Sequence, residues 1–379
     1  MPRLKKFLLF LFFFFLFASL SPRGHAAIPT IAWYPDPQTD AELNKSVTYR
    51  DLQVHNTGAE LYNASYYHDA LMEDGTVIYN QFFVHNLGPG SNHASADLTI
   101  IEPDGKVYRQ TENINQASFE NTPDKFRIAF GDFSVEGNPQ ARPAVYRLKS
   151  LYGNLLGDDL TYTCEAPAYK DSGVYFNGDK NNYEKWVTYC PRGVVSGRIM
   201  VGGKWRQVKG RGFADHAAAN PSISTGTALI NGMGIFIRGS NPGFGFSLME
   251  YRPLPNSAGV TMPGILVNIG DRNVIFTRDY KLDLDGWTDK GGGKFPTIFR
   301  LNIDRPGFKM KGEVRMERYL LSGSTLDGMS SKTARMIISK IAGDSRWARF
   351  VTGWKFDGAA ADKKFHEEGR AIVQIMFSK

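Results

Sequence analysis

The sequence contains a single Asp-His dipeptide, Asp215-His216, which is the first candidate for chemistry. A carboxyl that an apolar pocket keeps protonated can protonate an alkene, as the hydration or cyclisation of an isoprenoid requires. The alternative is structural: Asp215 accepts backbone N–H bonds and His216 ties two units together. Neighbouring residues on a strand face opposite sides, so the two side chains are not expected to enter one pocket. This alternation favours the structural role.

Aromatic side chains are the second set of candidates, because they offer a small apolar ligand broad contact surfaces with a polar tip where one is needed. Those expected to bind a hydrophobic molecule are Tyr66, Tyr67, Phe82, Phe213, Phe246 and Tyr251. The alternative for each ring is ordinary core packing.

The sequence gives little support for metal or cofactor chemistry. His55, His68 and His85 each lie near an aromatic strand, but no two of them have the spacing of a ligand pair on one element. There is no zinc motif, no GxSxG and no phosphate-cradling loop. We therefore expect neither a metal nor a cofactor.

The Asp-His dipeptide lies at the end of a predicted hairpin near the middle of the chain. Val194–Val201 alternates like a half-buried strand, Gly202-Gly203 suits a tight turn, and Lys204–Lys209 returns as the partner strand. We interpret residues 210–216 as the junction between two β units.

Short strands joined by close turns occupy both halves of the chain. Turn signatures such as Glu73-Asp74-Gly75, Pro103-Asp104-Gly105 and Gly270-Asp271 separate them. The pattern predicts an all-β protein of two antiparallel barrel or sandwich domains, residues 47–193 and 194–379, after an extended lead-in at 27–46. One amphipathic helix, capped at Ser330 or Ser331 and ended by Gly343, is expected near the C-terminus.

Residues 1–26 have the layout of a secretory signal peptide: a basic start, an apolar run at Phe7–Leu20 and small residues before the cleavage site. The alternative is a membrane anchor, but a helix of that run would span only about 21 Å of the roughly 30 Å of hydrocarbon. Removing the four basic residues of this segment lowers the formal net charge from +7 to +3. Such a small excess is not typical of nucleic-acid binding.

Only two cysteines occur, Cys164 and Cys190. An exported protein meets an oxidising compartment, in which they are expected to form a disulfide. The alternative is a pair of free thiols.

Several stretches together resemble the survival-factor (oxidative-stress survival) family of tandem lipocalin-like proteins, related to carotenoid-hydratase-like proteins and fungal Diels–Alderase-type enzymes. The matching stretches are Tyr66–Val84, Leu160–Lys170, Pro191–Ala219, Phe246–Arg252 and His366–Phe377. The resemblance implies two lipocalin-like domains and a lipid or isoprenoid ligand. The export signal is a departure, because the best-known members act inside eukaryotic cells.

We therefore expect an exported, periplasmic or secreted monomer that carries or chaperones a lipid or isoprenoid, with a link to stress survival and with transient membrane contact left open. The alternative is a hydratase, isomerase or cyclase on an isoprenoid-like or polyene substrate, with Asp215 as the acid. A structural envelope protein without a ligand is a third hypothesis.

Overall fold

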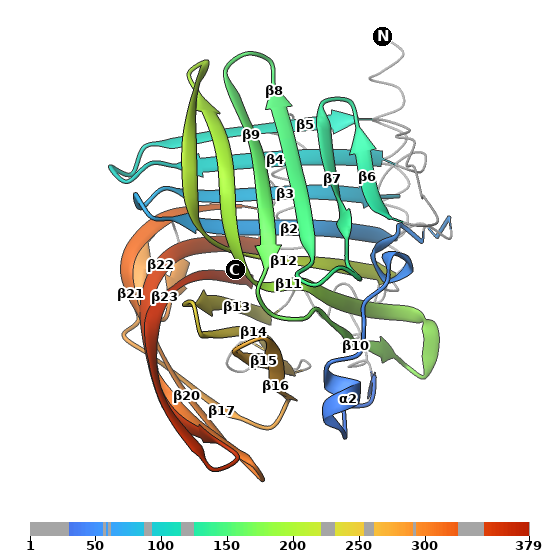
Figure 1. Ribbon diagram of the computed structural model, residues 1–379, viewed down its shortest axis with the longest axis vertical. Coiled ribbons are helices and arrows are strands. Elements are labelled where there is room, and N and C mark those ends of the chain that lie inside the picture. Colours follow the sequence, from blue (N-terminus) through green and yellow to red (C-terminus); the bar gives the residue numbers. More distant parts are fainter. Residues whose placement is uncertain are drawn as a thin grey trace, which may run out of the picture.

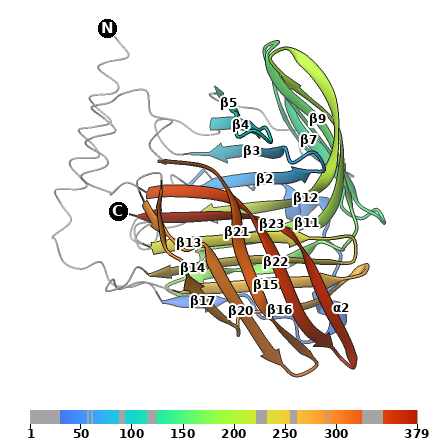
Figure 2. The same cartoon turned by 90° about the vertical axis from the view of Figure 1, so that its left-hand side faces the viewer.

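The computed structural model describes residues 30–55, 58–59, 62–86, 93–114, 125–220, 232–253, 261–290, 293–324 and 345–378. Most of them belong to antiparallel strands that form two large curled sheets (Figures 1 and 2). The predicted all-β class with two tandem lipocalin-like units is confirmed. The expected signal peptide at 1–26 and the expected helix between Ser330 and Gly343 lie outside the described residues. Within the described ranges, no helix combines the length and apolar character needed to cross a bilayer.

The first sheet has 12 strands in the described part of the chain. Ten of them follow one another across the sheet, and β10 (Tyr169–Phe176) and β1 (Ile31–Trp33) continue from β11. In spatial order the ten are β5 (Val107–Ile114), β4 (His93–Ile101), β3 (Val77–His85), β2 (Asn63–Met72), β12 (Lys204–Asn220), β11 (Asp179–Val201), β9 (Leu156–Cys164), β8 (Val145–Tyr152), β7 (Phe133–Asn138) and β6 (Phe126–Phe130).

The second sheet has 9 described strands and begins after residue 231. A separate small hairpin joins β18 (Thr288–Lys290) and β19 (Gly293–Phe295). In spatial order the sheet contains β16 (Arg272–Thr277), β15 (Met262–Ile269), β14 (Phe244–Pro253), β13 (Gly232–Ser240), β23 (Lys363–Ser378), β22 (Ser345–Ala360), β21 (Phe308–Ser324), β20 (Ile298–Arg305) and β17 (Lys281–Asp285).

The change from one sheet to the other comes later in the chain than the division placed between residues 193 and 194. That division falls inside β11, which pairs with β9 on one side and with β12 on the other. β12 in turn pairs with β2, so the whole β11–β12 hairpin belongs to the first sheet. The predicted turn of this hairpin is confirmed, because Gly202 and Gly203 have φ angles of 59° and 79°, which glycine adopts readily.

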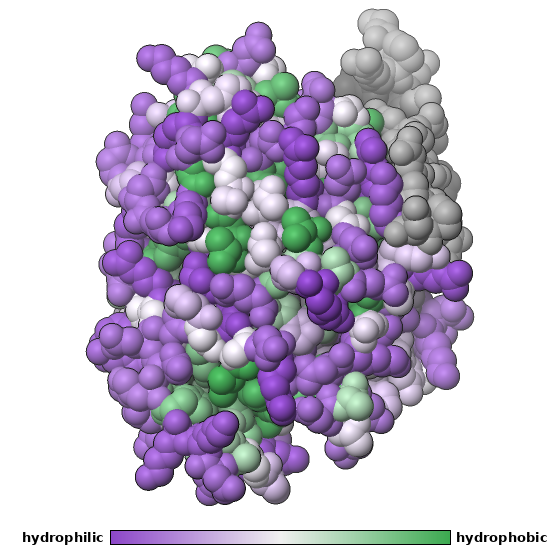
Figure 3. Space-filling view, viewed as in Figure 1, coloured by the Kyte–Doolittle hydropathy of each residue, from purple (hydrophilic) through white to green (hydrophobic). Residues whose placement is uncertain are grey.

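Packed side chains fill the inside of each curled sheet. Tyr66, Phe82, Tyr146, Tyr162 and Tyr189 are all 0% exposed inside the first. The second contains a matching aromatic cluster, Phe244, Phe246, Trp354 and Phe356. Charged and polar residues cover most of the face seen in Figure 3. The inside of each curled sheet is therefore a hydrophobic core of packed side chains.

The two sheets meet through their outer faces, with a third apolar cluster between them. Tyr67, Val77, Tyr79 and Phe213 of the first sheet pack there against residues of β21, β22 and β23. The described part of the segment expected as an extended lead-in, residues 30–46, contains β1 and the short helix α2 (Asp40–Leu43), and η1 (Tyr49–Leu52) follows it. It ties the units together: β1 pairs with β10, while Asn44 exchanges hydrogen bonds with Asn273 of β16 at 2.9 and 3.1 Å.

Cys164 of β9 and Cys190 of β11, the predicted pair, are joined by a disulfide. They are separated by 26 residues, so the bond closes a loop for which the chain-entropy estimate is roughly 3–4 kcal/mol. Both sulfurs are buried, and the bond links two neighbouring strands of the first sheet.

A buried polar cluster spans the inside of the first sheet. Asn80 of β3 donates from Nδ2 to Ser150 Oγ at 2.6 Å and to Asp158 Oδ2 at 2.8 Å. Burial raises the pKa of Asp158 to about 7, although hydrogen bonds that it accepts from Asn80 and Ser150 lower it. Oδ1 of Asn80 and Oδ1 of Asp158 have no hydrogen-bond donor among the described residues, and a proton on Asp158 supplies one to the cluster.

We expect Asp158→Asn to stabilise the protein at pH 8 by about 1–3 kcal/mol and to have little effect at pH 4. Because its pKa is raised, Asp158 contributes stability that is fully present at a pH below its ordinary pKa of 3.8. This stability is lost as the pH rises through about 7. Urea unfolding at both pH values measures this, with the exposed Asp132→Asn as control. Equal effects of Asp158→Asn on the free energy of unfolding at both pH values would contradict the raised pKa of Asp158.

Candidate active site between the two sheets

The layer between the two sheets contains buried charged residues beside a cavity. Strand alternation turns Tyr67 and Asp69 of β2 and Phe213 and Asp215 of β12 toward the second sheet. The register places Phe213 opposite Asp69 and Asp215 opposite Tyr67, so the two carboxyl-bearing residues lie on neighbouring strands. Arg238 of β13 reaches this face from the second sheet.

Arg238 bridges the two carboxylates. Its Nη1 lies 3.8 Å from Asp69 Oδ2, and its Nη2 lies 3.6 Å from Asp215 Oδ2. The side chains of Arg238 and Asp69 are only 9% and 3% exposed. The guanidinium also stacks over the rings of Tyr67, at 4.3 Å from the centroid, and Phe213, at 5.0 Å. Such contacts stabilise a cation that has lost most of its water.

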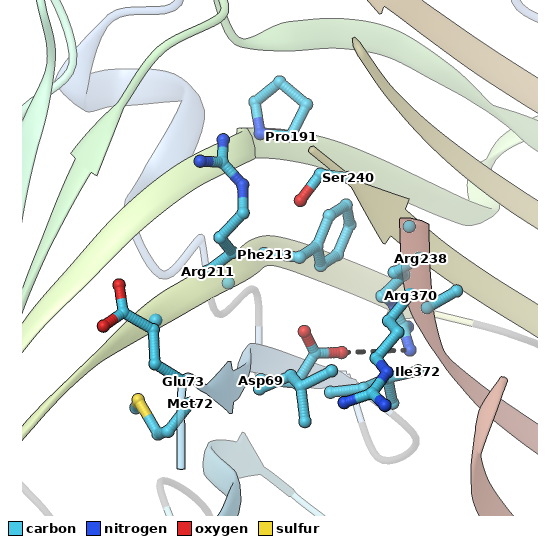
Figure 4. A pocket seen from close by; sticks show the side chains of 15 residues that line it. Asp69, Met72, Glu73, Pro191, Arg211, Phe213, Arg238, Ser240, Arg370 and Ile372 are labelled. Atoms are coloured by element: carbon cyan, nitrogen blue, oxygen red, sulfur yellow. Dashed lines mark ion pairs between the residues drawn. The ribbon is translucent and has the colours of Figure 1, made fainter. Parts of the chain in front are cut away.

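Two cavities lie on either side of Arg238 and Phe213. The larger, of about 270 Å³, has Asp69 on its wall and extends toward Arg211 and Arg370 (Figure 4). The smaller, of about 40 Å³, has Asp215 on its wall together with apolar and aromatic side chains, which are Tyr169, Trp186, Phe236, Leu248, Met249, Leu266 and Phe276. Asp69 is thus the carboxyl with room beside it for part of a small molecule.

Burial raises the pKa of Asp69 to about 7 and that of Asp215 to about 6, although the positive charge of Arg238 lowers both. Removal from water therefore outweighs the ion pairs, whose separations exceed normal hydrogen-bond length. A carboxyl with a pKa near neutrality can release and regain a proton, which suits a general acid.

Two neighbouring atoms of residues that line the larger cavity have no hydrogen-bond partner among the described residues. These are Asp69 Oδ2 and Arg238 Nη1, which are 3.8 Å apart. In Figure 4 the two side chains face each other beside the cavity. An oxygen atom of a ligand or a water molecule placed between them can accept from the guanidinium and donate to the carboxylate.

Asp215 and His216 face opposite sides of β12, as strand alternation predicts. The His216 ring stacks on Tyr66 at 4.3 Å inside the first unit, and its Nδ1 lies 3.0 Å from the carbonyl oxygen of Ser65. Burial lowers the pKa of His216 to about 4, so the imidazole is neutral at pH 7. His216 therefore does not act with Asp215 at one site.

The six rings expected to bind ligand are divided among four regions. Tyr66 and Phe82 lie in the core of the first unit, and Phe246 lies in that of the second. Tyr67 and Phe213 belong to the layer between the sheets, while Tyr251 lies beside Trp186 at 6.4 Å between ring centroids. Only Phe213 of the six lines the two cavities flanking Arg238.

The sequence interpretation missed Asp69 and Arg238. Both carry a signal that was available: each is a charged residue on the same strand face as an apolar ring two positions earlier, Tyr67 and Phe236 respectively. The three histidines considered for metal binding do not converge, and the described residues contain no group of three His, Cys, Asp or Glu side chains that could hold a metal ion.

Three solved structures have a similar fold over most of this chain. A protein from Nitrosomonas europaea assigned as AttH has a TM-score of 0.58 at 12% identity, with 88% of this chain and 98% of that chain covered. The structure of CghA with Sch210972 has a TM-score of 0.57 at 12% identity, with 93% of this chain and 99% of CghA covered. The structure of kievitone hydratase from Nectria haematococca has a TM-score of 0.53 at 12% identity, with 92% of this chain and 99% of the hydratase covered.

No family model and no curated protein matches the chain. At these identities the structural likeness establishes the fold. The resemblance to the survival-factor family and to its hydratase-like and Diels–Alderase-type relatives stays a prediction.

We expect Arg238→Met to destabilise the protein by about 3–5 kcal/mol at pH 8, because it leaves two buried carboxylates without their counter-ion. The loss should be smaller at pH 5, where both groups can take up a proton. Denaturant unfolding at the two pH values measures it.

The matched control for that variant is the triple variant Asp69→Asn/Arg238→Met/Asp215→Asn, which removes all three charges and should recover most of the stability at pH 8. A triple variant no more stable than Arg238→Met would show that the ion pairs are not the cause.

Proposed function

We propose that this protein is an enzyme that protonates a carbon–carbon double bond of an apolar, polyene- or isoprenoid-like molecule and so hydrates, isomerises or cyclises it. The observation that carries the proposal is the Asp69 carboxyl, buried beside Arg238 on the wall of the 270 Å³ cavity with a pKa raised to about 7. Asp69 takes the role of acid that the sequence interpretation gave to Asp215, because the cavity beside Asp215 is only about 40 Å³.

In the proposed first step, the proton of Asp69 moves to one carbon of the double bond. The π electrons form the new C–H bond, the neighbouring carbon becomes cationic, and Asp69 becomes a carboxylate. In hydration, a water oxygen then bonds to the cation and gives up a proton that restores the acid. In cyclisation a second double bond attacks the cation instead, and a proton then leaves a carbon next to the new cationic centre for the Asp69 carboxylate, which restores the acid.

Arg238 and Asp215 support this cycle. The guanidinium stabilises the Asp69 carboxylate that forms during the step, and its free Nη1–H can orient the attacking water across the 3.8 Å gap to Asp69. Asp215 pairs with the same guanidinium from the other side at 3.6 Å and limits its movement. Asp215 is therefore proposed as a positioning residue.

The comparisons support an enzyme more than the carrier first expected. One structural neighbour is a hydratase, and another is described with a small molecule bound. The filled interiors of both sheets also favour a site between the units over a ligand held inside either one. Export remains part of the proposal, supported by the Cys164–Cys190 disulfide, which suits an oxidising compartment.

The test uses an extract of apolar compounds from the protein's own host, incubated with the purified protein in D2O and analysed by mass spectrometry. Wild type should form products with deuterium bonded to carbon, and the rate should fall as the pH rises through about 7, because the acid form of Asp69 is lost. Asp69→Asn should lower the rate by about 10²–10⁴-fold. Asp215→Asn should retain more activity with a shifted pH profile.

The exposed Asp132→Asn serves as the matched control and should behave like wild type. A ligand that co-purifies and is recovered without deuterium from wild type would contradict the enzyme and favour a carrier. Equal activity of wild type and Asp69→Asn would remove Asp69 from the reaction.

A further inference from the structure

A third cavity, of about 420 Å³, lies at the β10–β11 side of the first unit and shares no residue with the candidate active site. Its wall is strongly basic. Four cationic side chains, Lys45, Arg50, Lys170 and Lys185, contribute to it, and Asp51 is the single carboxylate among the described residues that line it. The formal charge around the cavity is thus +3 with neutral histidines.

Two of these cations are held in place by their neighbours. Lys170, with a side chain only 16% exposed, lies 3.0 and 3.2 Å from the two oxygens of Asp51. The Lys185 ammonium lies over two tyrosine rings, 5.2 Å from the centroid of Tyr34 and 4.7 Å from that of Tyr183. Side chains that are already positioned lose less conformational entropy when a ligand binds.

Arg50 keeps hydrogen-bond donors for a ligand. Its Nε donates to Tyr49 Oη at 3.3 Å, and its carbonyl oxygen lies 2.8 Å from His55 Nε2. No carboxylate of the described residues pairs with Arg50, Lys45 or Lys185. Guanidinium N–H groups match the oxygens of a phosphate in pairs, and ammonium groups add compact charge.

The inner wall of the cavity separates it from the core of the first unit. His216 and Val187 line this wall, and the His216 ring is stacked on the buried Tyr66. A ligand there therefore remains at the surface of the unit. Since 420 Å³ exceeds the size of a bare anion, the group attached to the anion has room beside Tyr34 and Tyr183.

We propose that this cavity binds a phosphate monoester or diphosphate group, carried by a soluble molecule or by a lipid headgroup. A dianion or trianion matches the excess positive charge better than a single carboxylate does. This proposal does not depend on the proposed enzyme activity, because the two sites have no lining residue in common.

Isothermal titration calorimetry of the full chain with inorganic pyrophosphate tests the site. We expect binding that weakens about tenfold or more in Lys185→Gln and in Arg50→Gln, because each loses a charge-assisted contact. Lys311→Gln, which removes an exposed lysine on β21 of the second sheet, is the matched control and should bind like wild type. Circular dichroism confirms that the variants fold.

A second arm identifies the source of the phosphate. Sedimentation with phosphatidic acid vesicles, but not with phosphatidylcholine vesicles, and its loss in Lys185→Gln would favour a lipid headgroup. Pyrophosphate binding without vesicle binding would favour a soluble phosphate ester. Absence of pyrophosphate binding to wild type, or equal affinity in wild type, Lys185→Gln and Arg50→Gln, would overturn the proposal.

Discussion

The buried guanidinium of Arg238, set between Asp69 and Asp215, is the interaction on which the functional account depends. Taking an ion out of water costs several kcal/mol, and an ion pair about 4 Å long returns roughly 4 kcal/mol at an effective dielectric constant of 20. The aromatic faces of Tyr67 and Phe213 add to the stabilisation of the cation. Stability alone does not require such a cluster, because apolar residues of similar volume pack as well. Its presence beside a cavity favours a chemical role.

The placement of this cluster follows from how the two sheets are filled. Among the described residues, aromatic rings pack inside each unit, whereas the cavities lined by Asp69 and Asp215 lie between the units. The outer faces meet between β12 and β13, where strands of different units bring their charges together. The curled sheets thus support the layer that joins them, which is where the proposed reaction is placed. The lead-in reinforces this joint through Asn44 and Asn273.

Local patterns predicted the local features well. The glycines at 202 and 203 specify the hairpin, and the alternation along β12 separates Asp215 from His216. The joint between the sheets was less accessible, because β12 pairs with β2 from the beginning of the chain, and no local signal encodes that pairing. Asp69 and Arg238 become neighbours only through the packing of the two units. Sequence alone could show a charge on an apolar strand face at each position, but not that the two faces meet.

The most direct measurement is the titration of the buried carboxyls. In protein labelled with ¹³C at the aspartate carboxyls, comparison of wild type with Asp69→Asn and Asp215→Asn assigns the two signals. We predict apparent pKa values of about 7 for Asp69 and about 6 for Asp215. Titration of both groups near the ordinary aspartate value of about 4 would show that they are solvated carboxylates and would contradict the proposed acid.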